Sequence, residues 1–237
     1  MARQTYFADF SLVEVQQTFY QPPRTETLSR WLKEAPPGFE FTLKAWQLIT
    51  HTPSSPTYRR LRQPLPKNSW DRYGAFRPTD EVAEAWRVTL EAARRLAASV
   101  IVFQCPASFT PEPGHVANLR RFLTRARADA GVIRLAWEPR GAWPHKTFAG
   151  LCAEFDLLPI IDPFKHPRLP RMRHYFRLHG VTGYRYRYSD VDLNKLWDWC
   201  EDGTYCLFNN MNMAEDARRF LKLAETRRYK HKRETSF

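Results

Sequence analysis

Short apolar runs alternate with stretches of helical periodicity along almost the whole sequence. The runs are rich in β-branched and aromatic residues, as in Val100-Ile101-Val102-Phe103, and each is followed by a helical pattern or a long loop. Such alternation favours a parallel sheet covered by helices. The pattern predicts strands over residues 12–16, 40–46, 99–104, 132–138, 157–162, 174–179 and 205–209.

Helix start and stop signals lie between these runs. Thr25, Thr79, Ser189 and Asn212 stand where an N-cap is expected, and Gly131 stands just past the end of a periodic segment. The spacing predicts helices over residues 3–10, 26–34, 80–95, 113–130, 144–155, 190–201 and 213–224.

This order predicts an α/β fold, a (β/α)8 TIM-barrel-like single domain. Seven strands are one fewer than a closed barrel needs, and the chain opens on a short helical segment followed by a strand, so the first strand is expected to be missing. We predict the barrel over residues 1–226 and a basic C-terminal tail over residues 227–237.

Composition excludes several classes of protein. No stretch approaches the ~20 apolar residues of a membrane span, and the N-terminus lacks the apolar run of a signal peptide, so a cytoplasmic protein is expected. The four cysteines form no C-x-x-C pair, which argues against a zinc ribbon or a disulfide framework. The nine glycines form neither G-x-G-x-x-G nor a P-loop, so no nucleotide motif is present.

Polar side chains end several of the predicted strands. In a barrel they converge on the C-terminal face, where active sites of this fold lie. We predict catalytic roles for Glu14, Lys44, Glu138, Asp162 and His179, and anion binding by Gln104, Arg140, Arg177 and Asn209. The competing interpretation is a set of interior ion pairs without a function, such as Glu14 with Lys44 and Glu138 with Arg140 or Arg177.

Carboxylates and imidazoles in this set also suggest a metal. Glu14, Glu138, Asp162 and His179, together with His51, have the donor types that hold a divalent metal in hydrolytic centres. Two features argue against this hypothesis. No H-x-H or H-E-x-x-H spacing occurs, and Lys44 and the arginines compete for the same carboxylates.

Basic residues interleave with aromatic residues in three places: residues 58–73 of the long connection 47–78, residues 165–177 and residues 184–188. The chain has 37 Lys and Arg against 25 Asp and Glu, a net charge of +12. Guanidinium groups meet phosphates and aromatic rings stack on bases, which suits single-stranded or distorted nucleic acid. The predicted rim comprises Arg59, Arg60, Arg62, Trp70, Arg185, Tyr186 and Arg187. A solvated basic surface is the alternative.

Several signatures occur in order between residues 12 and 224. They include Pro36-Pro37-Gly38-Phe39-Glu40-Phe41, Ala136-Trp137-Glu138-Pro139-Arg140, Arg177-Leu178-His179-Gly180 and Leu207-Phe208-Asn209-Asn210. As a set they resemble the domain of unknown function 72, the YecE-like family. The resemblance implies a TIM-barrel-like fold and supplies no activity. Members usually begin with a strand and a Gly-rich turn, and this chain starts after them.

Two functions follow as hypotheses. The first is a nucleic-acid-associated protein, with metal-assisted phosphodiester processing at the C-terminal barrel face. The second is an enzyme acting on a phosphorylated or carboxylated small molecule, in which arginines hold the anion and Glu138 or His179 transfers protons. A non-catalytic scaffold is the third interpretation. The sequence does not determine the oligomeric state.

Overall fold

The computed structural model of the chain describes the backbone of residues 2–234 and the side chains of residues 2–228. By its internal contacts the chain divides into two compact units, Met1–Leu158 and Pro159–Phe237. The prediction of one domain over residues 1–226 stays a prediction. No helix in the described part of the chain is both long and apolar enough to cross a membrane.

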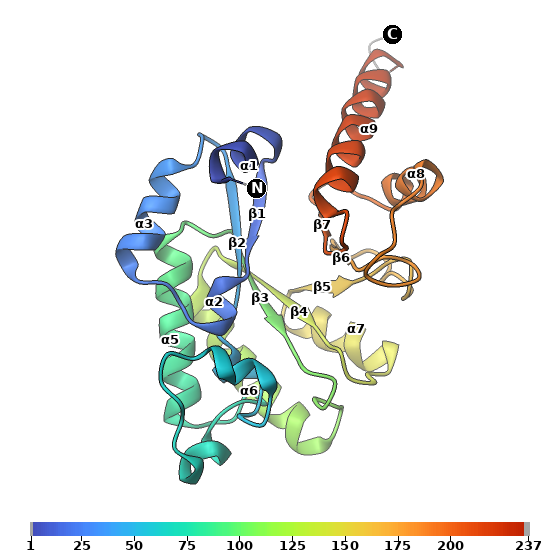
Figure 1. Cartoon of the computed structure of the whole chain (residues 1–237). Coiled ribbons are helices and arrows are strands. Elements are labelled where there is room, and N and C mark those ends of the chain that lie inside the picture. Colours follow the sequence, from blue (N-terminus) through green and yellow to red (C-terminus); the bar gives the residue numbers. More distant parts are fainter. Residues whose placement is uncertain (1, 235–237) are drawn as a thin grey trace. The chain divides into compact units, whose positions relative to one another are not determined.

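The first unit contains a parallel sheet at the predicted positions (Figure 1). In register, Val13 lies opposite Phe41, and Val102 lies opposite Ala136. The strands are β1 (Leu12–Val15), β2 (Glu40–Lys44), β3 (Val100–Gln104) and β4 (Arg134–Glu138).

Helices of the first unit follow these strands, and α3 and α5 pack against each other beside β1–β3 (Figure 1). The long connection after β2 folds into one α-helical turn and two 3-10 helices. The elements are α1 (Arg3–Asp9), α2 (Gln17–Tyr20), α3 (Thr25–Glu34), α4 (Gln47–Thr50), η1 (Pro56–Arg60), η2 (Lys67–Arg72), α5 (Asp80–Arg95), α6 (Pro113–Ala130) and α7 (His145–Glu154).

Between the sheet and its helices lies an aromatic core. Phe103 of β3 meets Trp86 of α5 with ring centroids 5.9 Å apart, and both rings contact Phe122 of α6. Phe76 joins this group at 5.9 Å from Phe103. Burying such rings contributes about 25 cal/mol for each Å² of apolar surface removed from water, so this cluster fixes the helices against the sheet.

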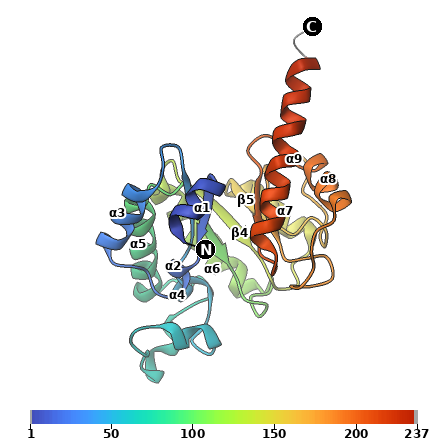
Figure 2. The same cartoon turned by 45° about the horizontal axis from the view of Figure 1, so that its top comes forward.

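The second unit continues the parallel pattern. Ile160 pairs with Tyr175, and Tyr175 pairs with Tyr205. Figure 2 shows α8 beside α9, which is packed against it. The elements are β5 (Leu157–Ile161, which begins in the first unit), β6 (Tyr175–Leu178), α8 (Asp190–Asp198), β7 (Tyr205–Phe208) and α9 (Met213–Glu234).

Three helix boundaries bear on the sequence predictions. Thr79 and Ser189 cap α5 and α8 as predicted, and Ser189 forms a full capping box with Asp192. The prediction for Thr25 is wrong: α3 already includes this residue, and its N-cap, Arg24, makes no side-chain cap bond. Residues 227–234, predicted to be a tail, continue α9, while residues 235–237 lie outside the described part.

Candidate functional site

Four buried polar side chains lie at the last or next-to-last residue of the strands of the first unit. Glu14, Lys44, Gln104 and Glu138 are each less than 9% exposed. Alternation along each strand places them on one face, and the register sets Gln104 directly opposite Glu138. The structure therefore brings together the part of the predicted cluster that belongs to β1–β4.

Lys44 is held by two different contacts. Its Nζ donates a 2.7 Å hydrogen bond to Oε1 of Gln104 and lies 4.3 Å from the ring centroid of Phe19. A cation over an aromatic face is stabilised by the ring quadrupole, more so when water is excluded. Phe19 was not predicted as a site residue, although its position just past the first strand was a usable signal.

Glu138 forms an ion pair with Arg140, whose Nε lies 3.1 Å from Oε1. The carboxylate is buried, whereas the Arg140 side chain is 43% exposed. This pair is one of those proposed under the interior ion-pair interpretation. The exposed guanidinium nevertheless leaves a cation at the mouth of the cluster, where solvent reaches it.

His51 lies in the same cluster. Its Nδ1 shares a 2.8 Å hydrogen bond with Oγ1 of Thr50, and its ring meets Phe19 edge to face at 4.9 Å. Burial, together with the charges of Lys44 and Arg140, lowers the pKa of His51 to about 3, and the charge of Glu138 opposes this shift only in part. The imidazole is therefore neutral at physiological pH, mainly because burial disfavours its charged form.

A tight backbone clamp positions His51. The amides of Gly74, Ala75 and Phe76 donate to the carbonyls of Leu48, Thr50 and Ile49. A Cβ on Gly74 would lie 2.2 Å from the carbonyl oxygen of His51, and Gly74 has a φ of +75°. Only glycine fits there, because any side chain would collide with the backbone that carries the imidazole.

Tyr6 and Gln16 surround Glu14. Gln16 donates a side-chain hydrogen bond to the carboxylate. Burial, with the negative charge of Glu14 as a second cause, raises the pKa of Tyr6 to about 12. Its hydroxyl donates to the carbonyl of Leu12. The α1 helix thus covers the start of β1.

The other predicted site residues belong to the second unit. Asp162 follows β5, and its two carboxylate oxygens accept the backbone N–H groups of Phe164 and His179 at 3.1 and 3.0 Å. Its carboxylate also lies 3.8 Å from Nδ1 of His179. Asp162 therefore ties the loop after β5 to the end of β6, a positioning role that the sequence did not predict.

Arg177 of β6 is 3% exposed, and Asn209 follows β7 with a buried Nδ2 that has no hydrogen-bond partner. The neighbouring Asn210 is fully buried, and its Nδ2 donates to Asp216 and to the carbonyl of Tyr186. Buried amide groups left unsatisfied are uncommon in proteins. Sequence analysis singled out Asn209 and missed Asn210, although the two are adjacent.

The metal hypothesis receives no support from the described residues. Two members of the predicted set, Glu14 and Glu138, belong to the first unit, and Asp162 and His179 belong to the second. Among residues 2–228, no group of three or more His, Cys, Asp or Glu side chains is arranged to hold a metal ion.

Many side chains of the predicted nucleic-acid rim already make contacts within the protein. Arg60 stacks over Tyr20 at 4.2 Å, and Arg187 forms an ion pair with Glu215. Tyr186 donates its hydroxyl to Asp192 at 2.7 Å. Trp70, at 37% exposed, donates its Nε1 to the carbonyl of Leu65. These contacts reduce the number of groups that a strand of nucleic acid would meet.

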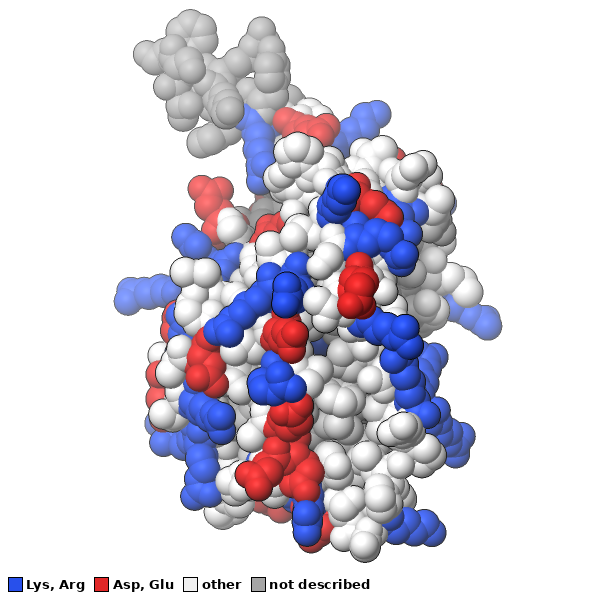
Figure 3. All heavy atoms as spheres, turned by 90° about the vertical axis from the view of Figure 1, so that its left-hand side faces the viewer, with Lys and Arg blue, Asp and Glu red and all other residues white. Residues whose placement is uncertain are grey.

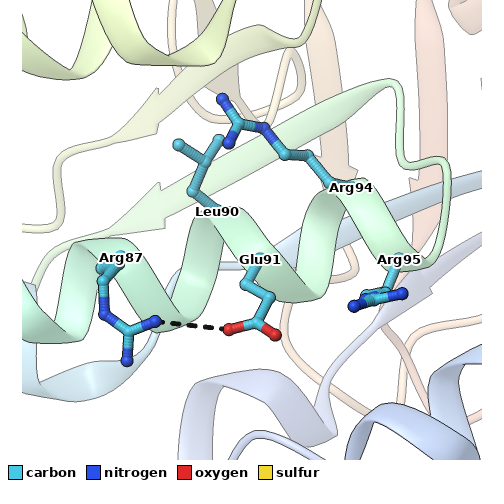
Figure 4. Close-up of a pocket in the computed structure, with 5 residues that line it drawn as sticks. All are labelled: Arg87, Leu90, Glu91, Arg94 and Arg95. Carbon is cyan, nitrogen blue, oxygen red and sulfur yellow. Dashed lines mark hydrogen bonds and ion pairs between the residues drawn. The ribbon is translucent and has the colours of Figure 1, made fainter.

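The described surface of the first unit has at least two hollows. One, of about 560 Å³, is lined by Trp46 and by Leu48 and Arg62 of the long connection. Three acidic residues at the start of α5 also line it: Asp80, Glu81 and Glu84. The other, of about 500 Å³, lies on α5 between Arg87, Leu90, Glu91, Arg94 and Arg95 (Figure 4). Neither includes a predicted catalytic residue.

Charges of both signs cover the side of the first unit that carries α3 and α5. Figure 3 shows Lys and Arg side chains interspersed with Asp and Glu side chains on this face. Arg87, for example, pairs with both Glu84 and Glu91. Interspersed charges weaken the field that a phosphate backbone would experience there.

Comparisons with known proteins agree on one family and fold. A family model described as "Protein of unknown function DUF72" matches residues 3–236. A DUF72 family protein from Thermotoga maritima is 22% identical, with a TM-score of 0.63 over 94% of this chain and 88% of that chain. One from Enterococcus faecalis is 18% identical, with a TM-score of 0.66 over 93% and 92%.

The chain is also similar in fold to the solved structure of an enzyme. D-psicose 3-epimerase, determined in the presence of D-fructose, is 13% identical, with a TM-score of 0.60 over 95% of this chain and 93% of that chain. No curated protein matches the sequence. These likenesses confirm the predicted α/β fold of TIM-barrel type.

Proposed function

This chain belongs to the DUF72 family of proteins of unknown function, and we propose that it is an enzyme that transfers protons on a small anionic molecule, a carboxylate or a phosphate ester. The proposed site is the cluster at the ends of β1–β4 in the first unit. Its chemistry is assigned from that unit alone.

The observation that supports this proposal most strongly is the neutral imidazole of His51 beside two cations, Lys44 and Arg140. Lys44 and Arg140 each depress the pKa of His51 more than Glu138 raises it. Cations in a largely buried place attract an anionic ligand, because screening by water is weak there. Arg140 is the exposed member and is suited to bind a carboxylate or phosphate with two parallel hydrogen bonds.

The remaining groups supply the proton chemistry. Glu138 is buried beside Arg140 and is the proposed proton-transfer group. Gln104, fixed by its bond to Lys44, offers a neutral amide to the ligand. His51, neutral and hydrogen-bonded to Thr50, is proposed to hydrogen-bond the ligand without carrying charge.

Calorimetry with inorganic phosphate, ribose 5-phosphate and gluconate tests the binding step. We expect at least one of these probes to bind, and Arg140→Gln to weaken its binding about tenfold or more, the loss of one charge-assisted contact. Arg87→Gln, an exposed arginine of α5, is the matched control and should bind as the wild type does. Binding of no probe, or equal weakening by the control, contradicts the proposal.

Proton transfer is tested separately from binding. Ribose 5-phosphate or gluconate is incubated with the protein in D2O, and exchange of the carbon-bound protons of the sugar is followed by NMR. Exchange that is lost in Glu138→Gln, with binding retained, supports the assignment of the acid–base role. Binding without exchange in the wild type would make this chain a binding module.

A second candidate function, single-stranded nucleic-acid binding, is favoured by the exposure of Tyr184 at 59% beside Arg185. An exposed ring next to a guanidinium can stack on a base. Fluorescence anisotropy with a labelled oligothymidine at several salt concentrations tests it. Tyr184→Ala should weaken binding with little change in salt dependence, whereas no binding at low salt removes this candidate.

A further inference from the structure

Two cysteines meet in the second unit. Cys200 follows the C-terminal end of α8, and Cys206 lies within β7. Their Sγ atoms are 3.5 Å apart and share a hydrogen bond. Both residues are partly exposed, whereas Cys105 and Cys152 are buried.

A tight turn brings the two thiols together. The amide of Thr204 donates to the carbonyl of Glu201, and the amide of Glu201 donates to Oγ1 of Thr204. Gly203 has a φ of +82°, which the turn needs and which glycine adopts without strain. The chain therefore reverses from α8 into β7 with the two sulfur atoms in contact.

The two thiols differ electrostatically. The hydrogen bond shared with Cys206 holds the pKa of Cys200 below its ordinary value. Burial opposes this shift, and the guanidinium groups of Arg168 and Arg228 add to it. The same hydrogen bond, with burial as a second cause, raises the pKa of Cys206. Arg168 is fixed near Cys200 by a 3.1 Å bond to the carbonyl of Trp199. A thiolate is the attacking species in thiol–disulfide exchange, so Cys200 is the nucleophile of the pair.

We propose that Cys200 and Cys206 form a redox-active dithiol, which low-molecular-weight disulfides oxidise to an intramolecular disulfide. This reaction is independent of the anion site proposed above. The Sγ atoms need to approach from 3.5 Å to about 2.05 Å, the length of an S–S bond.

The exchange proceeds in two steps. Cys200 gives its proton to solvent, and its Sγ attacks one sulfur of the small disulfide. The S–S bond of that molecule breaks, one thiolate leaves, and a mixed disulfide remains on Cys200. Cys206 then loses its proton and attacks Sγ of Cys200, which releases the second thiolate. The two protons end on the two released thiols. The protein pair is oxidised by two electrons, and the small disulfide is reduced to two thiols.

The other two cysteines serve as internal references. Burial raises the pKa of Cys152 to about 12. Cys105 is fully buried, and its sulfur accepts a 3.3 Å hydrogen bond from Nε1 of Trp137. Buried thiols of this kind are inert to exchange in the folded protein.

The test uses the folded, reduced full chain with oxidised glutathione as the probe. After incubation the protein is denatured, its free thiols are alkylated, and tryptic peptides are analysed by mass spectrometry. Cleavage after Lys195 and Arg218 places both cysteines in one peptide. We expect this peptide to lose two hydrogens and to escape alkylation, while Cys105 and Cys152 are alkylated.

Single substitutions assign the two roles. In Cys206→Ser the glutathione adduct should accumulate on Cys200, because the resolving thiol is gone. In Cys200→Ser the adduct on Cys206 should form more slowly by about tenfold or more, the effect of losing the thiolate. Cys152→Ser is the matched control and should form the disulfide at the wild-type rate.

Three outcomes would overturn the proposal. They are full alkylation of Cys200 and Cys206 after treatment, a rate of oxidation no greater than that of Cys152, and the absence of a persistent adduct on Cys200 in Cys206→Ser. A circular dichroism spectrum identical to that of the wild type shows that each variant is folded.

Discussion

The ammonium of Lys44 and the amide oxygen of Gln104 are joined by a 2.7 Å hydrogen bond across the neighbouring strands β2 and β3. Both side chains are buried, so the bond forms where water competes weakly. The bond links Lys44, one of the two cations of the proposed anion site, to β3, whose Gln104 lies opposite Glu138.

Replacing Gln104 by Leu should therefore destabilise the fold by about 2 kcal/mol, the typical loss when a buried charged group loses a hydrogen-bond acceptor. Urea unfolding measures the change. A double-mutant cycle with Lys44→Met should give a coupling energy of about 1 kcal/mol or more. Additive effects of the two substitutions would show that this bond contributes nothing to stability.

Substitution of Gly74 should strongly destabilise the folded protein. Gly74→Ala places a Cβ 2.2 Å from the carbonyl oxygen of His51 at a φ of +75°. We expect a loss of about 2–4 kcal/mol, from backbone strain and displacement of the chain that carries the imidazole. Gly150→Ala on α7 is the control: a Cβ there meets nothing within 4 Å, and alanine is the better helix former. Equal melting temperatures for the two variants would refute the clamp.

Acid should unfold the protein partly through His51. The pKa of its imidazole is about 3 in the folded chain and near 6.5 when exposed. The unfolded state therefore binds the proton first, and the contribution of neutral His51 to stability is lost as pH falls from about 6.5 toward 3. The expected loss is at most about 1.4 kcal/mol per pH unit.

Urea unfolding between pH 7 and pH 5 checks this effect. His51→Gln should show a shallower loss of stability than the wild type over that range. His145→Gln, at an exposed position on α7, should retain the wild-type profile. If His51→Gln keeps the full pH dependence, another group is responsible.

Asp162→Asn should also destabilise the protein. Both carboxylate oxygens accept backbone N–H groups, and an amide provides only one acceptor. The expected loss is about 1–3 kcal/mol, as for a buried donor left without a partner. Asp198→Asn, whose carboxylate is 61% exposed, should change stability by less than about 0.5 kcal/mol. If Asp162→Asn left the free energy of unfolding unchanged, Asp162 would again be a candidate catalytic residue.

Ser189 and Thr25 were both predicted to be helix N-caps, but only Ser189 caps a helix in the structure. Ser189→Ala removes a capping box and should cost about 1 kcal/mol. Thr25→Ala should be nearly neutral, because Thr25 lies inside α3 and makes no cap bond. Thermal unfolding of the two variants measures the difference, and a larger effect at Thr25 would contradict the observed start of α3.

The sequence by itself determined the strands, most helices and the class of fold. Strand periodicity and capping residues are local properties, so Val100–Gln104 and the Ser189 cap could be predicted from neighbouring residues alone. The polar strand ends, among them Lys44 and Glu138, were also predictable, because parallel strands present their carboxyl ends on one side.

Only the tertiary structure decided how those side chains are used. The low pKa of His51 depends on burial and on charges from β2 and from the segment after β4, and the role of Asp162 depends on two amides from separate segments. The contact between Cys200 and Cys206 depends on the turn over residues 201–204 that joins α8 to β7. These effects arise from contacts between residues that the fold brings together in space. Sequence periodicity does not reveal such contacts, so they could not be predicted from the sequence.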